Sequence, residues 1–285
     1  SVLLGDLGMH VAAGKEWHGR AVKQGAVVYV ALERAGLVQR RATAFKMKHG
    51  YADLPFAIVP GVYDFRHVDT ATIMVDCVRQ VEAEFGQDVV LIIVDTLSRA
   101  LCGGDENSSK DMGALVAAIG RIQAATGSHV SLVHHMPVDG SERLRGHGAL
   151  LGAMDTTLHV ERLASGLRTA TVVKANDSEE GERIAFNLES VDICEGTTAP
   201  VVVPAEALPQ AKARPEERLT PNQRTMFGIL HDAGQGGLTT DEWNDKARAA
   251  SIGVKRRADL VDIRMALETK GKVRQYVDRW TVNHE

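Results

Sequence analysis

The amino-acid sequence has few of the features that mark secreted, metal-binding or membrane proteins. Its 3 cysteines, Cys77, Cys102 and Cys194, form neither a CxxC pair nor a metal-ligand spacing. Reduced thiols in a cytoplasmic protein are therefore expected. The longest apolar run, Val89–Val94, is far shorter than the roughly 18–20 residues of a membrane span. No signal peptide is evident, and no membrane association is expected.

Aromatic residues make up only 5% of the sequence, and neither sign of charge dominates. The net charge of −4 gives no overall electrostatic indication of nucleic acid. A content of 44% hydrophobic and 25% charged residues is typical of a globular protein. A length of 285 residues fits one large domain, alone or with a smaller one.

Apolar runs and amphipathic segments alternate along the first two thirds of the sequence. Gly25–Leu32 is predicted to be a buried strand, and Val89–Val94 and His129–Val133 are predicted to be further strands. Asp69–Phe85 is predicted to be a helix between the first two. This alternation indicates an α/β fold with a mostly parallel sheet and helices on both faces. The strands predicted between residues 157 and 188 indicate an antiparallel extension of that sheet.

The last third changes character. Residues 196–218 carry four prolines and are predicted to be a linker between a core at residues 1–195 and a small domain at residues 219–285. Three predicted helices followed by a hairpin are typical of a winged helix, a form of helix-turn-helix domain. Its candidate recognition helix lies around Lys255–Lys270, whose basic residues would contact DNA phosphates. A protein-binding module is the alternative.

Charge divides near the same boundary. From Lys212 onward there are 14 Lys and Arg against 11 Asp and Glu, whereas the preceding part has 19 against 26. A modest positive patch on a small domain favours nucleic acid, but an ordinary solvated surface has the same composition.

Two carboxylates end predicted strands. Asp95 comes directly after Val89–Val94, and Glu33 comes directly after Tyr29–Leu32. Carboxyl ends of parallel strands face the crevice where α/β sheets bind ligands, so Asp95 could hold Mg²⁺ and Glu33 could act as a base for water. The alternatives are a structural Asp95, and a Glu33 that caps a helix or forms a surface salt bridge.

Four further residues carry candidate side chains. His134 and His135 end another strand, where one of them could sense a phosphate; packing and zinc binding are the alternatives. Arg145 lies in a glycine-rich loop, and Lys174 comes after a predicted strand. Either could act on a neighbouring subunit's phosphate, whereas each residue taken alone favours an ordinary surface charge.

The sequence contains no GxxxxGK[ST] phosphate-binding loop. Ser1 precedes a helical pattern of Leu3, Leu7 and Val11, and a helix of this kind begins directly after the lysine of such a loop. We therefore interpret Ser1 as the last position of the motif, with a hydroxyl that would ligate Mg²⁺. The interpretation places the first strand, the loop and its lysine before the start of this sequence.

Taken together, these residues resemble the RecA-like ATPases of the plasmid RepA helicase type, which are related to DnaB-type helicases. The resemblance covers residues 1–191. It rests on the order and spacing of six segments: Tyr29–Glu33, Val94–Arg99, Gly104–Ser109, Leu132–His135, Arg145–Asp155 and Val173–Asn176.

The resemblance implies an ATP- and Mg²⁺-dependent motor. By similarity, Glu33 would be the catalytic base, Asp95 the Walker B carboxylate and His135 the γ-phosphate sensor. Arg145 would be an arginine finger and Lys174 a second trans-acting cation. A homo-hexameric ring that moves single-stranded DNA, together with an initiator or primase partner, is implied. A DNA-binding initiator without unwinding activity, or an inactive truncated copy, is the alternative.

Overall fold

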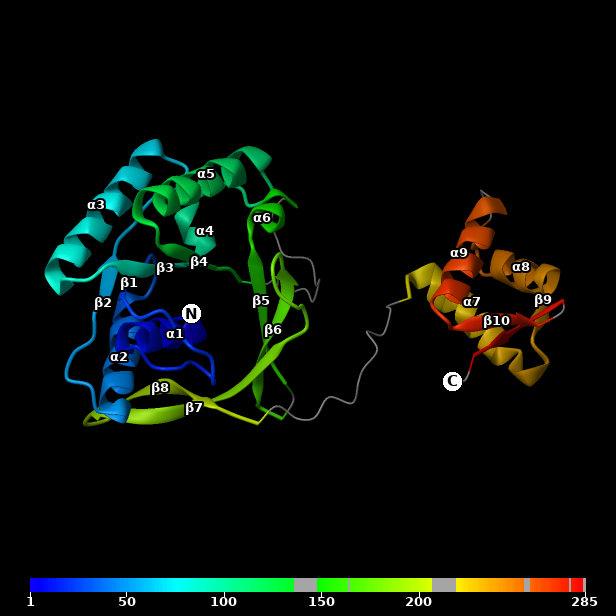
Figure 1. The fold of residues 1–285 in the computed structure, drawn as a ribbon. Coiled ribbons are helices and arrows are strands. Elements are labelled where there is room, and N and C mark those ends of the chain that lie inside the picture. Colours follow the sequence, from blue (N-terminus) through cyan, green and yellow to red (C-terminus); the bar gives the residue numbers. More distant parts are fainter. Residues whose placement is uncertain (136–147, 164, 207–218, 254–256, 277, 284–285) are drawn as a thin grey trace. The chain divides into compact units, whose positions relative to one another are not determined.

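The computed structural model describes residues 1–135, 148–163, 165–206, 219–253, 257–276 and 278–283. The chain divides into two compact units, Ser1–Leu208 and Pro209–Glu285. Figure 1 shows the course of the chain and labels its elements.

A parallel sheet forms the centre of the first unit. Its strands are β1 (Ala26–Ala31), β2 (Phe56–Pro60), β3 (Val89–Asp95) and β4 (His129–Val133), in the order β2-β1-β3-β4. All neighbouring strands run parallel. The predicted α/β fold with a parallel sheet is therefore confirmed.

Helices cover both faces of this sheet, as Figure 1 shows. One face packs against α3 (Val68–Phe85) and α5 (Ser109–Thr126), and the other against α1 (Val2–Ala13) and α2 (Ala35–His49). Each of these four helices ends at a glycine in the left-handed conformation, where a side chain would be strained. A short helix, α4 (Leu97–Ala100), begins directly after β3.

The strand β1 is buried on both faces, which explains its uninterrupted apolar sequence. Val28 and Val30 contribute to the core beneath α3 and α5, whereas Val27 and Tyr29 contribute to the core beneath α1 and α2. Successive side chains of a strand point to opposite faces, so both helical layers require apolar residues here.

A second sheet completes the first unit. It is antiparallel and contains β5 (Thr156–Arg162), β6 (Arg168–Ala175), β7 (Arg183–Cys194) and β8 (Thr197–Pro204) in sequence order. A short helix, α6 (Gly148–Ala153), precedes β5. Among the described residues the two sheets are not hydrogen-bonded to each other, so the predicted antiparallel strands form a sheet of their own.

The prediction of a linker at residues 196–218 is wrong for residues 197–204. Thr197–Pro204 forms the edge strand β8, which pairs with β7, and its Ala199 and Val201 pack into the core beneath α1 and α2. An edge strand tolerates proline because one side of its backbone donates no ladder hydrogen bonds. Proline content alone therefore misplaced this boundary. Residues 207–218 lie outside the described residues.

The second unit contains three helices and a small sheet. The helices are α7 (Pro221–Asp232), α8 (Thr240–Ala249) and α9 (Arg257–Thr269). A 3-10 turn, η1 (Gly234–Gly236), precedes the strand β9 (Leu238–Thr239). The hairpin strands β10 (Val273–Tyr276) and β11 (Arg279–Val282) complete a sheet in the order β10-β11-β9.

Local sequence explains where the first two of these helices begin. The Thr220 and Thr239 hydroxyls each accept a hydrogen bond from the backbone N–H three residues later. The side-chain oxygens of Gln223 and Glu242 at those positions accept the backbone N–H of Thr220 and Thr239 in turn, which makes two capping boxes. Trp243 and Trp280 pack in an apolar core that belongs to this unit alone.

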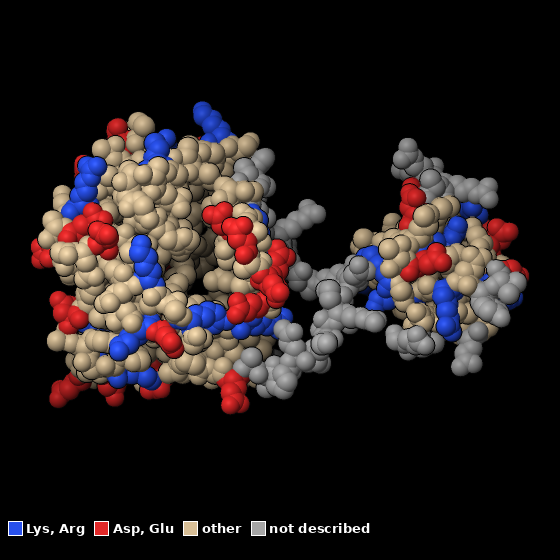
Figure 2. Space-filling view, in the orientation of Figure 1, with Lys and Arg blue, Asp and Glu red and all other residues tan. Residues whose placement is uncertain are grey.

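The surfaces of both units mix the two signs of charge over the face seen in Figure 2. Within the part of the chain that the structure describes, no helix combines the length and the apolar character needed to cross a membrane.

Candidate functional site

The carboxyl ends of β1, β3 and β4 lie side by side. Ala31 of β1 pairs with Asp95 of β3, and Asp95 pairs with Val133 of β4. Glu33 and His135 each come two positions after the paired residue of their own strand. The three predicted residues Glu33, Asp95 and His135 therefore leave adjacent strands at one edge of the sheet. This edge is where open α/β sheets bind ligands.

Asp95 occupies the middle of this row of strand ends and is only 8% exposed. Both of its oxygens accept hydrogen bonds: the Ser1 hydroxyl donates to Oδ1 at 2.9 Å, and the Tyr29 hydroxyl donates to Oδ2 at 2.6 Å. Burial, and then the nearby Asp95 carboxylate, raise the pKa of Tyr29 well above its usual value. The phenol therefore stays protonated and acts as a donor.

The start of α1 lies next to this carboxylate. Ser1 is the residue before the helix, but its side chain forms no capping bond and contacts Asp95 instead. The first turn contains no acidic residue. The N-terminus of a helix carries a partial positive charge and free N–H groups, so it favours a neighbouring carboxylate or phosphate. The contact brings the predicted pair Ser1 and Asp95 together.

Glu33 lies over the segment directly after β3. Its Oε1 accepts hydrogen bonds from the Thr96 hydroxyl at 3.3 Å and from Arg99 Nε at 3.2 Å. The Glu33 side chain is 33% exposed and that of Arg99 is 65% exposed. Arg34, not Glu33, precedes α2, so the helix-capping alternative for Glu33 is wrong and the salt-bridge alternative describes its contact. The peptide bond between Asp95 and Thr96 is cis.

The two histidines after β4 occupy different environments. His134 is half-buried and His135 is exposed. Among the described residues, no hydrogen bond or ion pair joins His135 to Glu33 or Asp95. No cluster of three or more His, Cys, Asp or Glu residues suited to a metal ion occurs in the described ranges, so nothing there supports zinc at this pair.

Of the two predicted trans-acting cations, Lys174 does not join this row. Lys174 lies on β6 of the antiparallel sheet, where its Nζ donates a hydrogen bond to the carbonyl of Met154. Arg145 lies outside the described residues. At this row of strand ends, Ser1 contacts Asp95, and Glu33 contacts Thr96. His135 follows β4, the strand next to β3.

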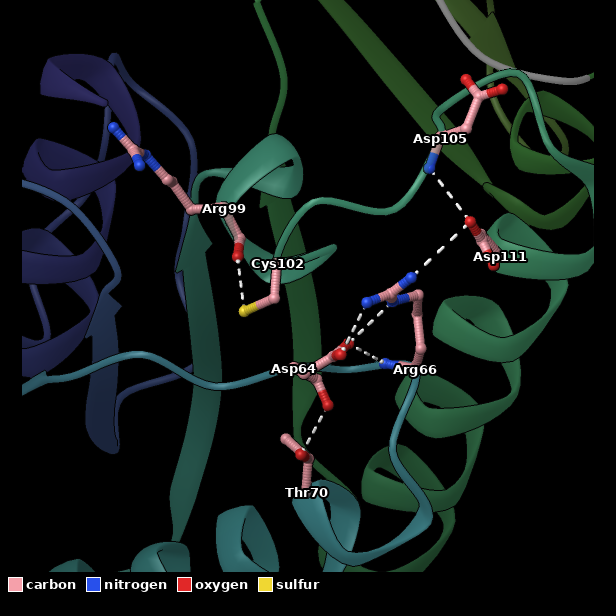
Figure 3. Close-up of polar contacts among 7 residues, drawn as sticks. All are labelled: Asp64, Arg66, Thr70, Arg99, Cys102, Asp105 and Asp111. Carbon is pink, nitrogen blue, oxygen red and sulfur yellow. Dashed lines mark hydrogen bonds and ion pairs between the residues drawn. The ribbon is translucent and has the colours of Figure 1, made fainter.

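A network of ionic contacts holds the loop between α4 and α5 beside these strand ends, as Figure 3 shows. Arg66 donates to both oxygens of Asp64, at 3.0 and 2.8 Å, and its Nη1 lies 3.7 Å from Asp111 Oδ2. The same Asp111 oxygen accepts the backbone N–H of Asp105 at 3.0 Å. A Cβ at Gly104 would lie 2.7 Å from the Arg66 guanidinium, so only glycine fits there without displacement.

Sequence reasoning missed two contacts of the site: the phenol of Tyr29 and the guanidinium of Arg99. A signal was present for Tyr29, because a tyrosine in a fully buried strand needs a hydrogen-bond partner for its hydroxyl. For Arg99 the signal was only its position four residues after Asp95.

A comparison with protein families finds that residues 1–141 match the AAA domain family. No curated protein matches the sequence. Among solved structures, the chain is similar to one described as the RadB recombinase. That similarity has a TM-score of 0.43 and 16% sequence identity, and it covers 58% of this chain and 76% of that one. Residues 1–141 are therefore similar to AAA domains.

Proposed function

We propose that the chain is the motor of a hexameric replicative DNA helicase of the plasmid or phage type, which hydrolyses ATP and moves along single-stranded DNA. The observation that carries the proposal is the Ser1–Asp95 contact at the centre of the row of strand ends. It joins the positive end of a helix, a hydroxyl and a carboxylate, which are the groups that a nucleotide phosphate and its metal ion require.

The donor set fits Mg²⁺. This ion prefers oxygen ligands, keeps several waters and shares the phosphates of its nucleotide, so one hydroxyl and one carboxylate are sufficient protein ligands. In the proposal Ser1 and Asp95 hold it, directly or through water. When bound, the ion would neutralise charge on the phosphates.

The other proposed roles depend on position. Glu33 would accept the proton of the attacking water, and its hydrogen bonds from Thr96 and Arg99 use Oε1 alone. His135 would contact the γ-phosphate from the neighbouring strand. Arg145 and Lys174 would act on the site of an adjacent subunit, which is why the proposal includes a ring.

We further propose that the second unit is a winged helix. Its order of helices, the hairpin of β10 and β11 and the third strand β9 support that fold. An initiator or primase partner also belongs to the proposal.

Strand separation on a forked DNA substrate tests the motor function. The 285 residues contain no phosphate-binding loop motif, so the assay uses a version of the chain with a Gly-x-x-x-x-Gly-Lys loop placed before Ser1. We expect ATP-dependent release of one strand. Nucleotide-dependent DNA binding without strand release would favour the initiator alternative. Failure to bind ATP in this version would overturn both.

A further inference from the structure

The helix α9 of the second unit has one side fixed in the core. Leu260 and Leu267 are 1% and 0% exposed, and Ile263 packs beside them. Arg264 is also turned inward: it is 8% exposed and donates a hydrogen bond to Asn244 of α8. Arg264 is the only Lys or Arg between residues 259 and 269, so this stretch presents no cation to the solvent.

The outer side of α9 carries apolar and acidic residues. Val261 and Met265 are 41% and 60% exposed, and they are neighbours on the helix surface because they are four residues apart. Asp262 is exposed beside them, and Asp259 and Glu268 are exposed at the two opposite edges of this outer side. This side therefore has an apolar centre with carboxylates around it.

Such a surface does not suit DNA. A helix that enters the major groove needs side chains that donate to phosphates and bases, and nearby carboxylates repel the backbone. The described basic side chains near α9 lie beyond its last residue: Lys270 directly after the helix, where its Nζ donates to Gln223 Oε1, Lys272 and Arg274 on or beside β10, and Arg279 on β11. The prediction that α9 reads DNA is therefore not supported by its exposed residues from Asp259 to Thr269.

We infer that the outer side of α9 (Asp259, Val261, Asp262, Met265 and Glu268) is a docking surface for a protein helix whose apolar residues are flanked by Lys or Arg. Charge complementarity favours this occupant: the carboxylates would pair with the flanking cations, while Val261 and Met265 would contact the apolar residues. The unbranched methionine side chain adapts to an apolar partner. This inference does not depend on the ATPase proposal.

The test is a titration of the full chain, labelled with ¹³C at its methionine methyl groups. One probe is a synthetic amphipathic helix with leucines on one face flanked by lysines. The second replaces those lysines by glutamates, and the third is a short DNA duplex. A Met265→Leu variant identifies the Met265 signal, and the signal of the buried Met226 reports that the second unit remains folded.

We expect the lysine peptide to shift the Met265 signal, and the glutamate peptide and the duplex to leave it unchanged. Met265→Glu and Asp262→Lys should each weaken binding of the lysine peptide about tenfold, since the first removes a central apolar contact and the second places a like charge opposite the flanking lysines. Val62→Glu is the matched control, because Val62 is 84% exposed but lies in the first unit.

The inference would be overturned by a Met265 shift caused by the duplex, by equal binding of the two peptides, or by unchanged binding of the lysine peptide to Met265→Glu. A Met265 signal that broadens with protein concentration alone would overturn it too, because a second copy of the chain would then be the occupant.

Discussion

The phenol of Tyr29 donates a hydrogen bond to Asp95 over 2.6 Å, from the middle of β1 to the end of β3. Both residues are buried, and the Ser1 hydroxyl contacts the other Asp95 oxygen. The carboxylate is thereby held in one orientation before any ligand binds. Fixed orientation of a ligating carboxylate by neighbouring donors is a general feature of metal sites in proteins.

Replacement of Tyr29 by Phe removes this donor and leaves Oδ2 of the buried Asp95 without the hydrogen bond from the phenol. We expect the variant to lose about 1–3 kcal/mol in the free energy of unfolding, because an unsatisfied buried charge keeps its desolvation cost. Urea unfolding at neutral pH measures the loss. In an Asp95→Asn background the same replacement should cost less, and an equal cost in both backgrounds would show that the hydrogen bond is not the cause.

A second prediction concerns Glu33 in the loop-bearing version of the chain. Glu33→Gln should preserve ATP binding and slow hydrolysis by about 10²–10⁴, because glutamine cannot accept the proton of water. Single-turnover hydrolysis and equilibrium binding of a fluorescent ATP analogue measure the two effects separately. Turnover at the wild-type rate would remove Glu33 from the mechanism.

The predicted arginine finger is tested by mixing subunits. Arg145→Ala alone should be inactive, but a mixture with Glu33→Gln should recover part of the activity. Some interfaces of the mixed ring would then pair an intact base with an intact finger. ATP hydrolysis across a series of mixing ratios is the measurement. A series in which no mixture exceeds the separate variants would withdraw support from the assignment of Arg145.

The row of strand ends could be predicted from sequence because it depends on a regular feature. Val89–Val94 and Gly25–Leu32 are apolar throughout, and parallel strands place the residues after their carboxyl ends at one edge of the sheet. The order β2-β1-β3-β4 then made Glu33 and Asp95 neighbours. Periodicity cannot show a contact between side chains far apart in sequence, such as Tyr29 with Asp95, 66 positions away.

The error at β8 has a different origin. Pro200 and Pro204 are typical of linkers, but here they occupy an edge strand that pairs with β7. Only the pairing of Val201 and Val202 with the preceding strand distinguishes an edge strand from a linker here, and that pairing depends on tertiary packing. The outer side of α9 could not be predicted from the basic residues near the helix, because its exposed residues are acidic and apolar.

The Arg66 network yields a prediction for the loop between α4 and α5. Arg66→Ala should lower the free energy of unfolding, since it removes a bidentate pair with Asp64 and the contact with Asp111. The hydrogen bonds from Arg66 also hold the pKa of Asp64 below its usual value. Arg79→Ala is the control, because its pair with Asp76 is exposed and should contribute less than about 1 kcal/mol. Equal costs for the two variants would contradict a structural role for the network.

A buried acid on α1 gives the protein a predicted pH dependence. Asp6 is 2% exposed, accepts a hydrogen bond from the Trp17 indole at 2.9 Å and lies 3.5 Å from His10 Nδ1. Its Oδ1 has no hydrogen-bond partner among the described residues. Burial raises the pKa of Asp6 from 3.8 to about 6, although His10 and Trp17 act in the opposite direction.

Because the folded-state pKa of Asp6 lies above its unfolded value, the protonated form is the one that the fold favours. The stability that it contributes is present at low pH and is lost as the pH rises from about 4 to about 6, which amounts to roughly 3 kcal/mol. Asp6→Asn keeps an acceptor for Trp17 but cannot ionise, so its stability relative to the wild type should increase over this window and stay constant above it. Urea unfolding of both proteins between pH 4 and pH 8 measures the difference. The other histidines near α1, His18 and His49, are present in both proteins, so their contributions to the difference in stability largely cancel. If the free energy of unfolding changed with pH in the same way in both proteins, burial would not oppose the ionisation of Asp6 in the folded protein.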